Sequence, residues 1–283
     1  MVFKKGILLD SLQLDLDEAL AVAAESGADG VQFYAVPHKM AALAGTGSAA
    51  ASLRRKIHGY DLEIASLCGD TGGHGFERRE ENVQKITTTR KIIDFASELE
   101  TTVITTHIGV VPESECEKRT IMQEALHEIC RYAEKRGILI AVETGPERSE
   151  VLRDFIVETG EKSLKVNFDP ANLVMIQGED PSEAVRILKD YIVHTHAKDG
   201  RMIRKCNPVT IYDAFAEGNP DAIDFDSWFV ELPLGSGDVH FDRYLPALET
   251  AGYSGYLTIE REAGSNRVKD VVDGINFLKG VIQ

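Results

Sequence analysis

The 283-residue chain is predicted to fold as a single (β/α)8 TIM barrel of the α/β class. Apolar strand-like runs alternate with amphipathic helical stretches along the whole chain, as in βα units with a parallel sheet. There are eight such pairs, and a single barrel commonly has about 250 residues. Acidic or histidine residues end the last four runs, at the face that carries active sites in barrels. A doubly wound sheet is the alternative fold.

The expected strands and helices follow one another in regular order. Strands are expected at residues 6–10, 30–35, 63–68, 102–108, 138–144, 164–169, 192–196 and 256–260. Helices are expected at residues 15–26, 48–60, 81–100, 114–136, 149–159, 181–190, 242–251 and 267–281. No linker, repeat or low-complexity segment divides the chain, so we expect residues 1–283 to form one domain.

Several expected helix ends carry residues suited to that position. A glycine follows four of the helices, where a left-handed conformation is needed and glycine costs least. These glycines are Gly27, Gly137, Gly160 and Gly252. Asp180 precedes Pro181, which predicts an N-cap followed by a proline in the first helical position.

Two connections depart from the regular pattern. The one at residues 200–238, after the seventh strand, contains Trp228 and an expected short helix near residues 208–216. Connections longer than about 15 residues are often lids or binding loops, so we expect this one to influence the choice of substrate. Its Gly-Ser-Gly segment, residues 235–237, is interpreted as a turn, because a lone GxG is a weak signal for phosphate binding. The other connection, at residues 70–79, is rich in glycine.

Composition excludes several classes of protein. A net charge of -15 would repel a phosphate backbone, so nucleic acid is not expected as a partner. The 43% hydrophobic content and 27% charged residues are typical of a globular chain. The four cysteines have no CxxC spacing, as in a reduced cytosolic protein. No signal-peptide core or membrane-spanning run is present, so we expect a cytoplasmic protein without a membrane partner.

Titratable residues end the fifth to eighth expected strands, which occupy one arc of the barrel rim. They are Glu143, Asp169, His196 and Glu260. A carboxylate buried alone at such a position is costly, and the four side chains converge on one point. Because side chains alternate along a strand, His194 lies one pleat deeper than His196 and is expected to be an interior residue. Glu262 shares a face with Glu260 and is an alternative ligand.

The convergence of these residues predicts a metal site. Three carboxylates so close together repel one another unless a cation lies among them, and the natural candidate is one divalent metal ion. Oxygen-rich coordination with one imidazole suits manganese, magnesium or cobalt in an octahedral site, whereas structural zinc prefers thiolates and a tetrahedron. Manganese is the first choice, and zinc remains an alternative.

The sequence resembles the xylose isomerase-like TIM barrels, also called the sugar phosphate isomerase/epimerase or AP endonuclease family 2 superfamily. The resemblance covers nearly the whole chain. It rests on VETG at Glu143, NFDPAN at Asp169, HTHAKDGR at His196, PLGSGDV at residues 233–239 and GYLTIERE at Glu260. It implies that these four residues bind one metal ion and that the partner is a small sugar or sugar-derived substrate. A homo-oligomer is the assembly that the family suggests.

The resemblance also implies a reaction. Family members that epimerise ketoses at C3 use the two metal-binding glutamates as acid and base, so Glu143 and Glu260 are the expected catalytic residues. A metal-dependent isomerase or epimerase of a sugar or sugar phosphate, acting by proton abstraction next to a carbonyl, is therefore the leading hypothesis. The alternatives are a lyase that dehydrates an inosose or a dehydroshikimate-like compound at the same site, and a non-catalytic sugar-binding barrel.

Five further residues are expected to contact the substrate. They are Cys68, His107, Asn172, Lys198 and Arg201. His107 ends the fourth strand at the barrel mouth. The side chains of Lys198 and Arg201 could neutralise an anionic substrate or an enediolate. Ketose epimerases usually have a histidine where Asn172 stands, and a Glu-Asn-x-Arg pattern where this chain continues from Ala197 to Arg201. Each residue also has a structural interpretation, such as a turn, an ion pair with Asp199 or a small apolar filler.

Overall fold

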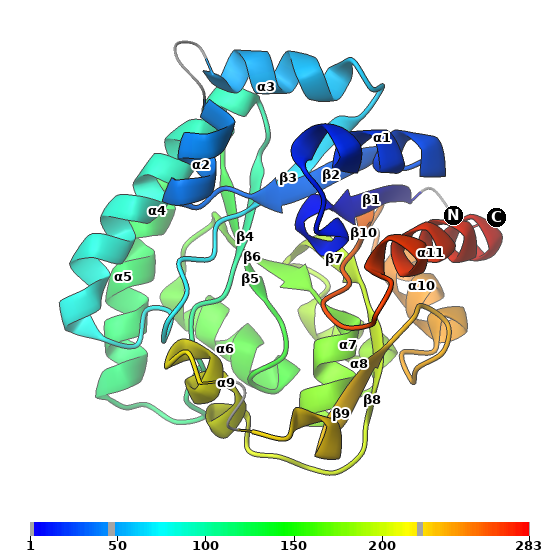
Figure 1. Cartoon of the computed structure of the whole chain (residues 1–283). Coiled ribbons are helices and arrows are strands. Elements are labelled where there is room, and N and C mark those ends of the chain that lie inside the picture. The colour runs from blue at the N-terminus through cyan, green and yellow to red at the C-terminus, as the bar shows by residue number, and fades with distance from the viewer. Residues whose placement is uncertain (1–2, 45–48, 220–222, 283) are drawn as a thin grey trace.

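The computed structural model describes residues 3–44, 49–219 and 223–282. Eight parallel strands form a closed barrel (Figure 1). They are β1 (Lys4–Leu8), β2 (Gly30–Tyr34), β3 (Glu63–Cys68), β4 (Val103–Thr106), β5 (Leu139–Glu143), β6 (Leu164–Phe168), β7 (Ile192–Ala197) and β10 (Tyr256–Ile259). The barrel closes between β1 and β10, where Lys4 lies opposite Tyr256 and Ile7 opposite Ile259. The predicted fold is confirmed, and the doubly wound alternative is wrong.

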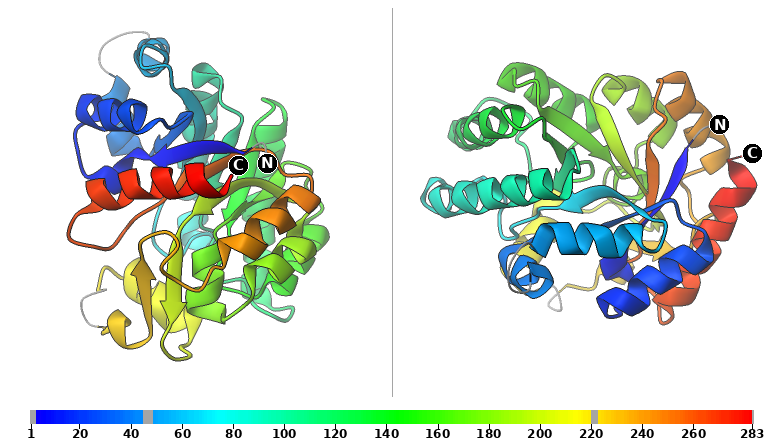
Figure 2. Two further views of the ribbon diagram at one scale, coloured as in Figure 1. Left: turned by 90° about the vertical axis from the view of Figure 1, so that its right-hand side faces the viewer. Right: turned by 90° about the horizontal axis from the view of Figure 1, so that it is seen from above.

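Helices cover the outside of the barrel, as the right-hand view of Figure 2 shows from above. The expected ones are α1 (Leu16–Ser26), α3 (Ala49–His58), α4 (Arg79–Leu99), α5 (Glu117–Glu134), α6 (Ser149–Thr159), α8 (Pro181–Leu188), α10 (Phe241–Thr250) and α11 (Arg267–Val281). Ser48, the expected first residue of the second helix, lies outside the described residues. Each strand is thus covered on its outer side, as expected for a parallel sheet.

The residues predicted to end helices adopt the expected conformations. Gly27, Gly137, Gly160 and Gly252 all have positive φ, between 68° and 81°. The side chain of Asp180 accepts a hydrogen bond from the Ser182 N–H at the start of α8. Glu100 ends α4 with a φ of 60° and has no glycine signal. Its backbone N–H is bonded to the last carbonyls of α4, which offsets the strain of that conformation.

Several short helices were not predicted. The segments η1 (Leu9–Leu12) and α7 (Pro170–Asn172) directly follow β1 and β6, and α2 (Pro37–Ala44) precedes α3. One π-helical turn, η2 (Leu173–Gln177), continues α7. Of these, η1, α7 and η2 have three to five residues and are too short to show helical periodicity in a sequence.

The long connection between β7 and β10 folds as a β-hairpin that carries a helix, and we call residues 199–238 the insertion. Strand β8 (Asp199–Met202) pairs antiparallel with β9 (Phe229–Leu232). Between them lie α9 (Pro208–Ala216), as predicted, and the short η4 (Phe225–Ser227). Residues 220–222 lie outside the described part of the chain. These elements lie together at one end of the barrel (Figures 1 and 2).

Asp199 anchors the base of the insertion. Its carboxylate accepts hydrogen bonds from the backbone N–H groups of Gly200, Gly235, Gly237 and Val239, at 2.9–3.2 Å. A Cβ on Gly237 would lie 2.2 Å from Asp199 Oδ1, so only glycine allows this approach. The Gly-Ser-Gly segment is therefore a turn around a carboxylate, and two of its N–H groups are already bonded.

The strands form a largely apolar core. Ile7, Val31 and Leu67, from three neighbouring strands, are fully buried.

Helix length and hydropathy also bear on membrane association. Across the described residues, no helix has the length and apolar character that a membrane crossing requires.

Candidate metal centre

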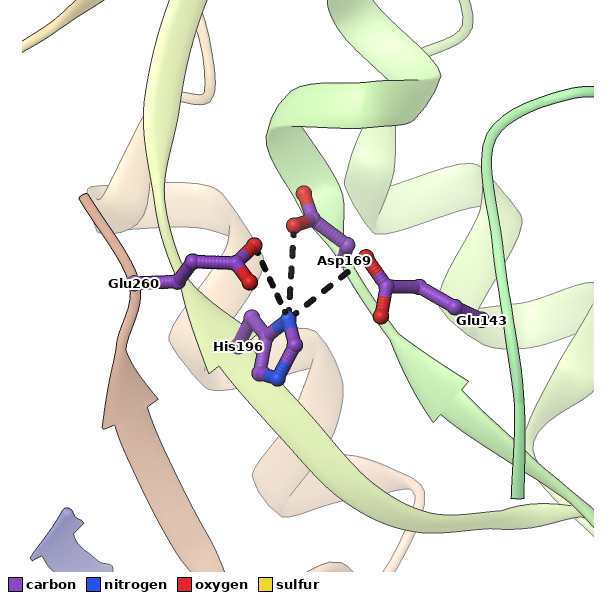
Figure 3. A group of neighbouring side chains, drawn as sticks. All are labelled: Glu143, Asp169, His196 and Glu260. Carbon is purple, nitrogen blue, oxygen red and sulfur yellow. Dashed lines mark ion pairs between the residues drawn. The ribbon is translucent and has the colours of Figure 1, made fainter. Parts of the chain in front are cut away.

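Four titratable side chains converge at the carboxyl ends of β5, β6, β7 and β10. They are Glu143, Asp169, His196 and Glu260, and each is at most 7% exposed. One ligand atom of each residue lies within 4.8 Å of those of the others. His196 Nδ1 is 3.2 Å from Glu260 Oε2 and 3.6 Å from both Glu143 Oε1 and Asp169 Oδ2 (Figure 3). The structure brings together the four residues that the sequence analysis proposed as ligands.

Local hydrogen bonds hold Asp169 at the end of β6. Its backbone N–H donates to Thr144 Oγ1 at 2.8 Å, and the same hydroxyl donates to the Asp169 carbonyl at 3.0 Å. Asp169 Oδ1 caps α7 by accepting the Asn172 N–H at 2.9 Å. The other carboxylate oxygen, Oδ2, is buried and has no hydrogen-bond partner within the described chain. Because a buried carboxylate oxygen without a partner is costly, we expect a cation to bind at Oδ2.

A chain of hydrogen bonds orients the imidazole of His196. Thr105 Oγ1 donates to the Leu67 carbonyl and accepts from Gln32 Nε2 at 2.8 Å. This arrangement turns Gln32 Oε1 towards His196 Nε2, 3.0 Å away. Because an amide oxygen only accepts, Nε2 carries a proton and Nδ1 faces the three carboxylates. Such a bond to the second ring nitrogen is typical of metal-binding histidines.

Two amide groups orient Glu143. Asn167 Nδ2 donates to Oε2 and Asn172 Nδ2 donates to Oε1, both at 3.0 Å. The nearby Gly145 has a φ of 144°, and a Cβ there would lie 2.6 Å from the Asn172 Cβ. Glycine at this position therefore allows Asn172 to approach. Asn172, expected to contact substrate, lies against the proposed ligand Glu143.

Lys198 lies between the glutamates that follow β10. Its Nζ donates to Glu260 Oε2 at 2.9 Å and pairs with Glu262 Oε2. Lys198 is 3% exposed, whereas the side chain of Glu262 is 62% exposed. Glu260 belongs to the convergent four, and Glu262, the alternative ligand considered from the sequence, does not. Lys198 and His196 therefore both balance the charge of the same carboxylate oxygen, Glu260 Oε2.

Burial and mutual charge shift the pKa values of these groups. Burial lowers the pKa of His196, but the carboxylates of Glu260 and Glu143 outweigh it and raise that pKa well above its usual value. Burial raises the pKa of Glu260, but His196 and Lys198 outweigh it and hold that pKa well below its usual range. For Asp169 burial dominates and raises the pKa. In the absence of a metal, the charged imidazole compensates the surrounding carboxylates.

The donor set fits a divalent metal ion. Three carboxylates and one imidazole nitrogen supply oxygen-rich coordination of the kind that manganese, magnesium and cobalt prefer. The unpartnered Asp169 Oδ2 and the inward-facing His196 Nδ1 are the atoms that such an ion would engage. Metal binding would release the proton of Nδ1, since a histidine ligand must be neutral at the bonding nitrogen.

His107 extends the centre towards β3. Its Nδ1 is 3.1 Å from Asp70 Oδ2, and its Nε2 is 3.7 Å from Glu143 Oε1. Burial lowers the pKa of His107, but Glu143 and Asp70 outweigh it and raise that pKa to about 10. The side chain is 33% exposed, and the ring of Tyr212 from α9 lies 6.2 Å away. His107 therefore lies at the mouth, beside the cluster, as the sequence analysis expected.

Three other residues considered from the sequence do not belong to the convergent four. Arg201 is about half exposed and pairs with Asp238 at 2.9 Å. Cys68 is a buried thiol at the end of β3, and burial raises its pKa, which disfavours a reactive thiolate. His194 is an interior residue, as expected. Its Nε2 is 3.3 Å from Ser66 Oγ, and burial holds its pKa well below the usual value.

Sequence reasoning assigned no role to three residues of the site. Asp70 follows β3, so the rule that identified the four ligands could have found it. Gln32 lies in β2 and carries no distinguishing spacing. Tyr212 comes from α9, and its hydroxyl lies 3.1 Å from the position that a Gly145 Cβ would occupy. No sequence signal places an insertion residue beside β5.

Known proteins resemble this chain in sequence. Residues 20–281 match the sequence model of a family described as xylose isomerase-like TIM barrel. An uncharacterized protein of Methanocaldococcus jannaschii is 26% identical over 221 residues, which are 72% of this chain and 64% of that protein. The chain therefore spans less than two thirds of the length of that relative.

Solved structures also resemble the chain. A xylose isomerase domain protein from Planctomyces limnophilus is 27% identical with a TM-score of 0.80, covering 99% of this chain and 96% of that one. The probable 3-DHS dehydratase of Bacillus anthracis is 16% identical with a TM-score of 0.76, covering 98% and 99%. D-allulose 3-epimerase from Methylomonas sp., solved with D-allulose, is 16% identical with a TM-score of 0.71, covering 98% and 96%. The last two likenesses establish the fold alone.

Proposed function

The chain belongs to the xylose isomerase-like TIM barrel family, and we propose that it is a metal-dependent isomerase or epimerase of a small sugar. The observation that carries this proposal is the convergence of three carboxylates and one imidazole at the carboxyl ends of consecutive barrel strands. Barrel enzymes carry their catalytic groups at that face. Membership of a fold family alone does not define a reaction, so the proposal rests on the site.

The four convergent residues are proposed to hold one divalent ion, with manganese as the first choice. Such an ion supplies a Lewis acid that polarises the carbonyl and hydroxyl oxygens of a bound sugar. Gln32 keeps the Nδ1 of His196 directed at the ion, and Thr144 holds the backbone of Asp169. We assign Asp169 and His196 a single role, which is to bind the ion.

Glu143 and Glu260 are proposed to move protons as well as to bind metal. They lie on opposite sides of His196 (Figure 3). One carboxylate takes the proton from the carbon next to the carbonyl and keeps it, and the other glutamate, in its protonated form, donates its own proton to the opposite face. The configuration of that carbon is thereby inverted. The amides of Asn167 and Asn172 orient Glu143, and Lys198 orients Glu260.

A lyase reaction at the same site is the second candidate. It also begins with removal of a proton next to a carbonyl, and it differs in expelling a hydroxyl group as water. The buried ammonium group of Lys198, 2.9 Å from Glu260 Oε2, favours this candidate because its positive charge can stabilise a departing hydroxyl while a glutamate supplies the abstracted proton to it. One solved structure of the same fold is that of a probable 3-DHS dehydratase.

Proton exchange in deuterated water tests both candidates. Manganese-loaded protein is incubated with a panel of ketoses, inososes and dehydroshikimate-like acids, and each product is analysed by NMR and mass spectrometry. An epimerase adds one deuterium next to the carbonyl without loss of water, whereas a lyase product is lighter by one water. Protein treated with a chelator is the control and should be inactive. Absence of exchange across the panel, with metal bound, would favour the non-catalytic sugar-binding barrel and contradict the proposal.

A further inference from the structure

A cavity of about 430 Å³ opens beside the metal centre, between the ends of β1 and β10 and the insertion. Glu260, one of the two proposed proton-moving residues, forms part of its wall. The wall also contains Phe215, Phe225 and Phe229 of the insertion. Glu260 is therefore shared by the candidate metal centre and this cavity. The volume lies within the range of about 300–1,000 Å³ that is usual for small-molecule sites.

The insertion contributes several aromatic side chains to the wall of this cavity. The rings of Phe215 and Phe225 are stacked, with centroids 5.0 Å apart and an angle of 9° between their planes. Phe229 and Trp228 pack against Phe225 at 5.9 and 6.3 Å. Phe215 is nevertheless 57% exposed, although α9 has a buried face at Ile211 and Ala214. An exposed aromatic ring at the wall of a cavity indicates a binding role more than a packing role.

The charges around the cavity disfavour an anionic ligand. Its wall contains five carboxylates and two guanidinium groups. The carboxylates are Asp10, Asp226, Glu231, Glu260 and Glu262. Arg261 is already paired with both Glu231 and Asp270. Arg267 donates a hydrogen bond to the backbone carbonyl of Glu262 and so lies close to that glutamate. Lys39 pairs with Asp10, and Lys198 pairs with Glu260 and Glu262, but neither lysine belongs to the wall. A phosphate group in this cavity would therefore face more carboxylates than guanidinium groups, and both guanidinium groups already have partners.

We propose that this cavity is a distal subsite for an uncharged sugar ring, so that the substrate is a neutral ketose carrying a second sugar and not a sugar phosphate. This inference rests on the proposed function, because it places the reacting ketose at the metal. The weakly positive C–H groups on one face of a pyranose suit the negative face of Phe215. The surrounding carboxylates accept hydrogen bonds from its hydroxyl groups.

Binding of matched ligands tests the subsite. Fructose, fructose 6-phosphate and two glucosyl-fructose disaccharides, linked through O5 or O6, are titrated into the manganese-loaded protein by calorimetry. At least one disaccharide is expected to bind about tenfold more tightly than fructose, and the phosphate no more tightly than fructose. Trp228 is the only tryptophan and packs against Phe225, so its fluorescence should change with a disaccharide and not with fructose. Disaccharides that bind no better than fructose, or tighter binding of the phosphate, overturn the inference.

Two variants test whether the preference for the disaccharide depends on Phe215. Phe215→Ala is expected to remove the preference for the disaccharide while changing fructose binding less than twofold. Ile203→Ala is the matched control, because Ile203 lies in the same insertion, is 56% exposed and is outside the cavity wall. A preference that survives Phe215→Ala contradicts the assignment. Proton exchange measured in parallel separates the two proposals: exchange without disaccharide preference overturns only the subsite, and preference without exchange overturns only the reaction.

Discussion

The metal centre and the insertion occupy the same end of the barrel but are built differently. Each of the four convergent side chains comes from the carboxyl end of a barrel strand and is at most 7% exposed. The insertion is a two-stranded hairpin with α9 and η4 between its strands, and it leaves Phe215 and Ile203 more than half exposed. Its base is held by one carboxylate, that of Asp199.

The difference separates two requirements of the proposed enzyme. Groups that bind a metal and move protons need positions defined within a fraction of an ångström, which strands packed in a barrel provide. A surface that selects among sugars tolerates more variation, and connections between strands supply it in barrel enzymes. We therefore expect substitutions in the centre to affect turnover, and substitutions in the insertion to affect the choice of ligand.

The largest effect is expected from the proposed acid and base. Glu143→Gln and Glu260→Gln should each lower kcat by about 10²- to 10⁴-fold, because the amide cannot exchange a proton. Glu262→Gln is the matched control, since Glu262 lies two residues from Glu260 and outside the metal cluster. Its kcat should fall less than about tenfold. Equal losses in Glu260→Gln and Glu262→Gln would contradict the assignment of Glu260.

A buried carboxyl next to the centre should show a pH-dependent effect on stability. Burial raises the pKa of Glu147 to about 8, while the Val111 N–H, His107 and Arg119 oppose the shift and Glu179 adds to it. Between about pH 4.5 and 8 the Glu147 carboxyl is therefore protonated in the folded state and ionised in the unfolded state. Wild-type stability should fall across that range, relative to Glu147→Gln, by an amount on the order of 4 kcal/mol.

Denaturant unfolding at pH 5 and pH 8.5 measures this difference. At pH 5 the wild type and Glu147→Gln should be nearly equally stable, and at pH 8.5 the variant should be the more stable. The opposite order, or no change with pH, would show that Glu147 is ionised in the folded protein. Kinetic parameters of the variant at pH 5 serve as a control for an intact site.

A smaller effect is expected on metal affinity. Gln32→Leu removes the acceptor that orients His196 Nε2–H, and loss of such a partner typically weakens metal binding about 10- to 100-fold. Gln84→Leu, at an exposed position of α4, is the control and should leave the affinity unchanged. Competition with a fluorescent chelator for manganese gives both values. An affinity unchanged in Gln32→Leu would mean that His196 does not depend on this bond.

The smallest effect is expected at Arg201. Its guanidinium pairs with Asp238 on the outside of the insertion, so Arg201→Gln should change KM less than about threefold. The sequence analysis interpreted Arg201 as a substrate contact, and a KM raised more than tenfold would restore that interpretation. Steady-state kinetics with the substrate identified in the exchange panel decide between the two.

The sequence by itself determined the barrel and the composition of its centre. Eight strand-like runs were visible because a buried parallel strand is an uninterrupted apolar segment, and the observed strands begin within two residues of the expected positions. Glu143, Asp169, His196 and Glu260 were visible because each charged side chain interrupts or ends such a segment. These signals are local, so no contact had to be known.

Only the tertiary structure decided which groups surround those ligands. Gln32 lies 164 positions from His196 in the chain, and Lys198 lies 62 positions from Glu260, so no spacing could pair them. Closure of the barrel brings β2 and β10 near β7 and creates both contacts. Likewise, the hairpin of the insertion formed because β8 and β9 could pair across 26 intervening residues (203–228). That pairing brings Phe215 and Phe225 to the cavity beside Glu260, and it depends on packing that no local pattern records.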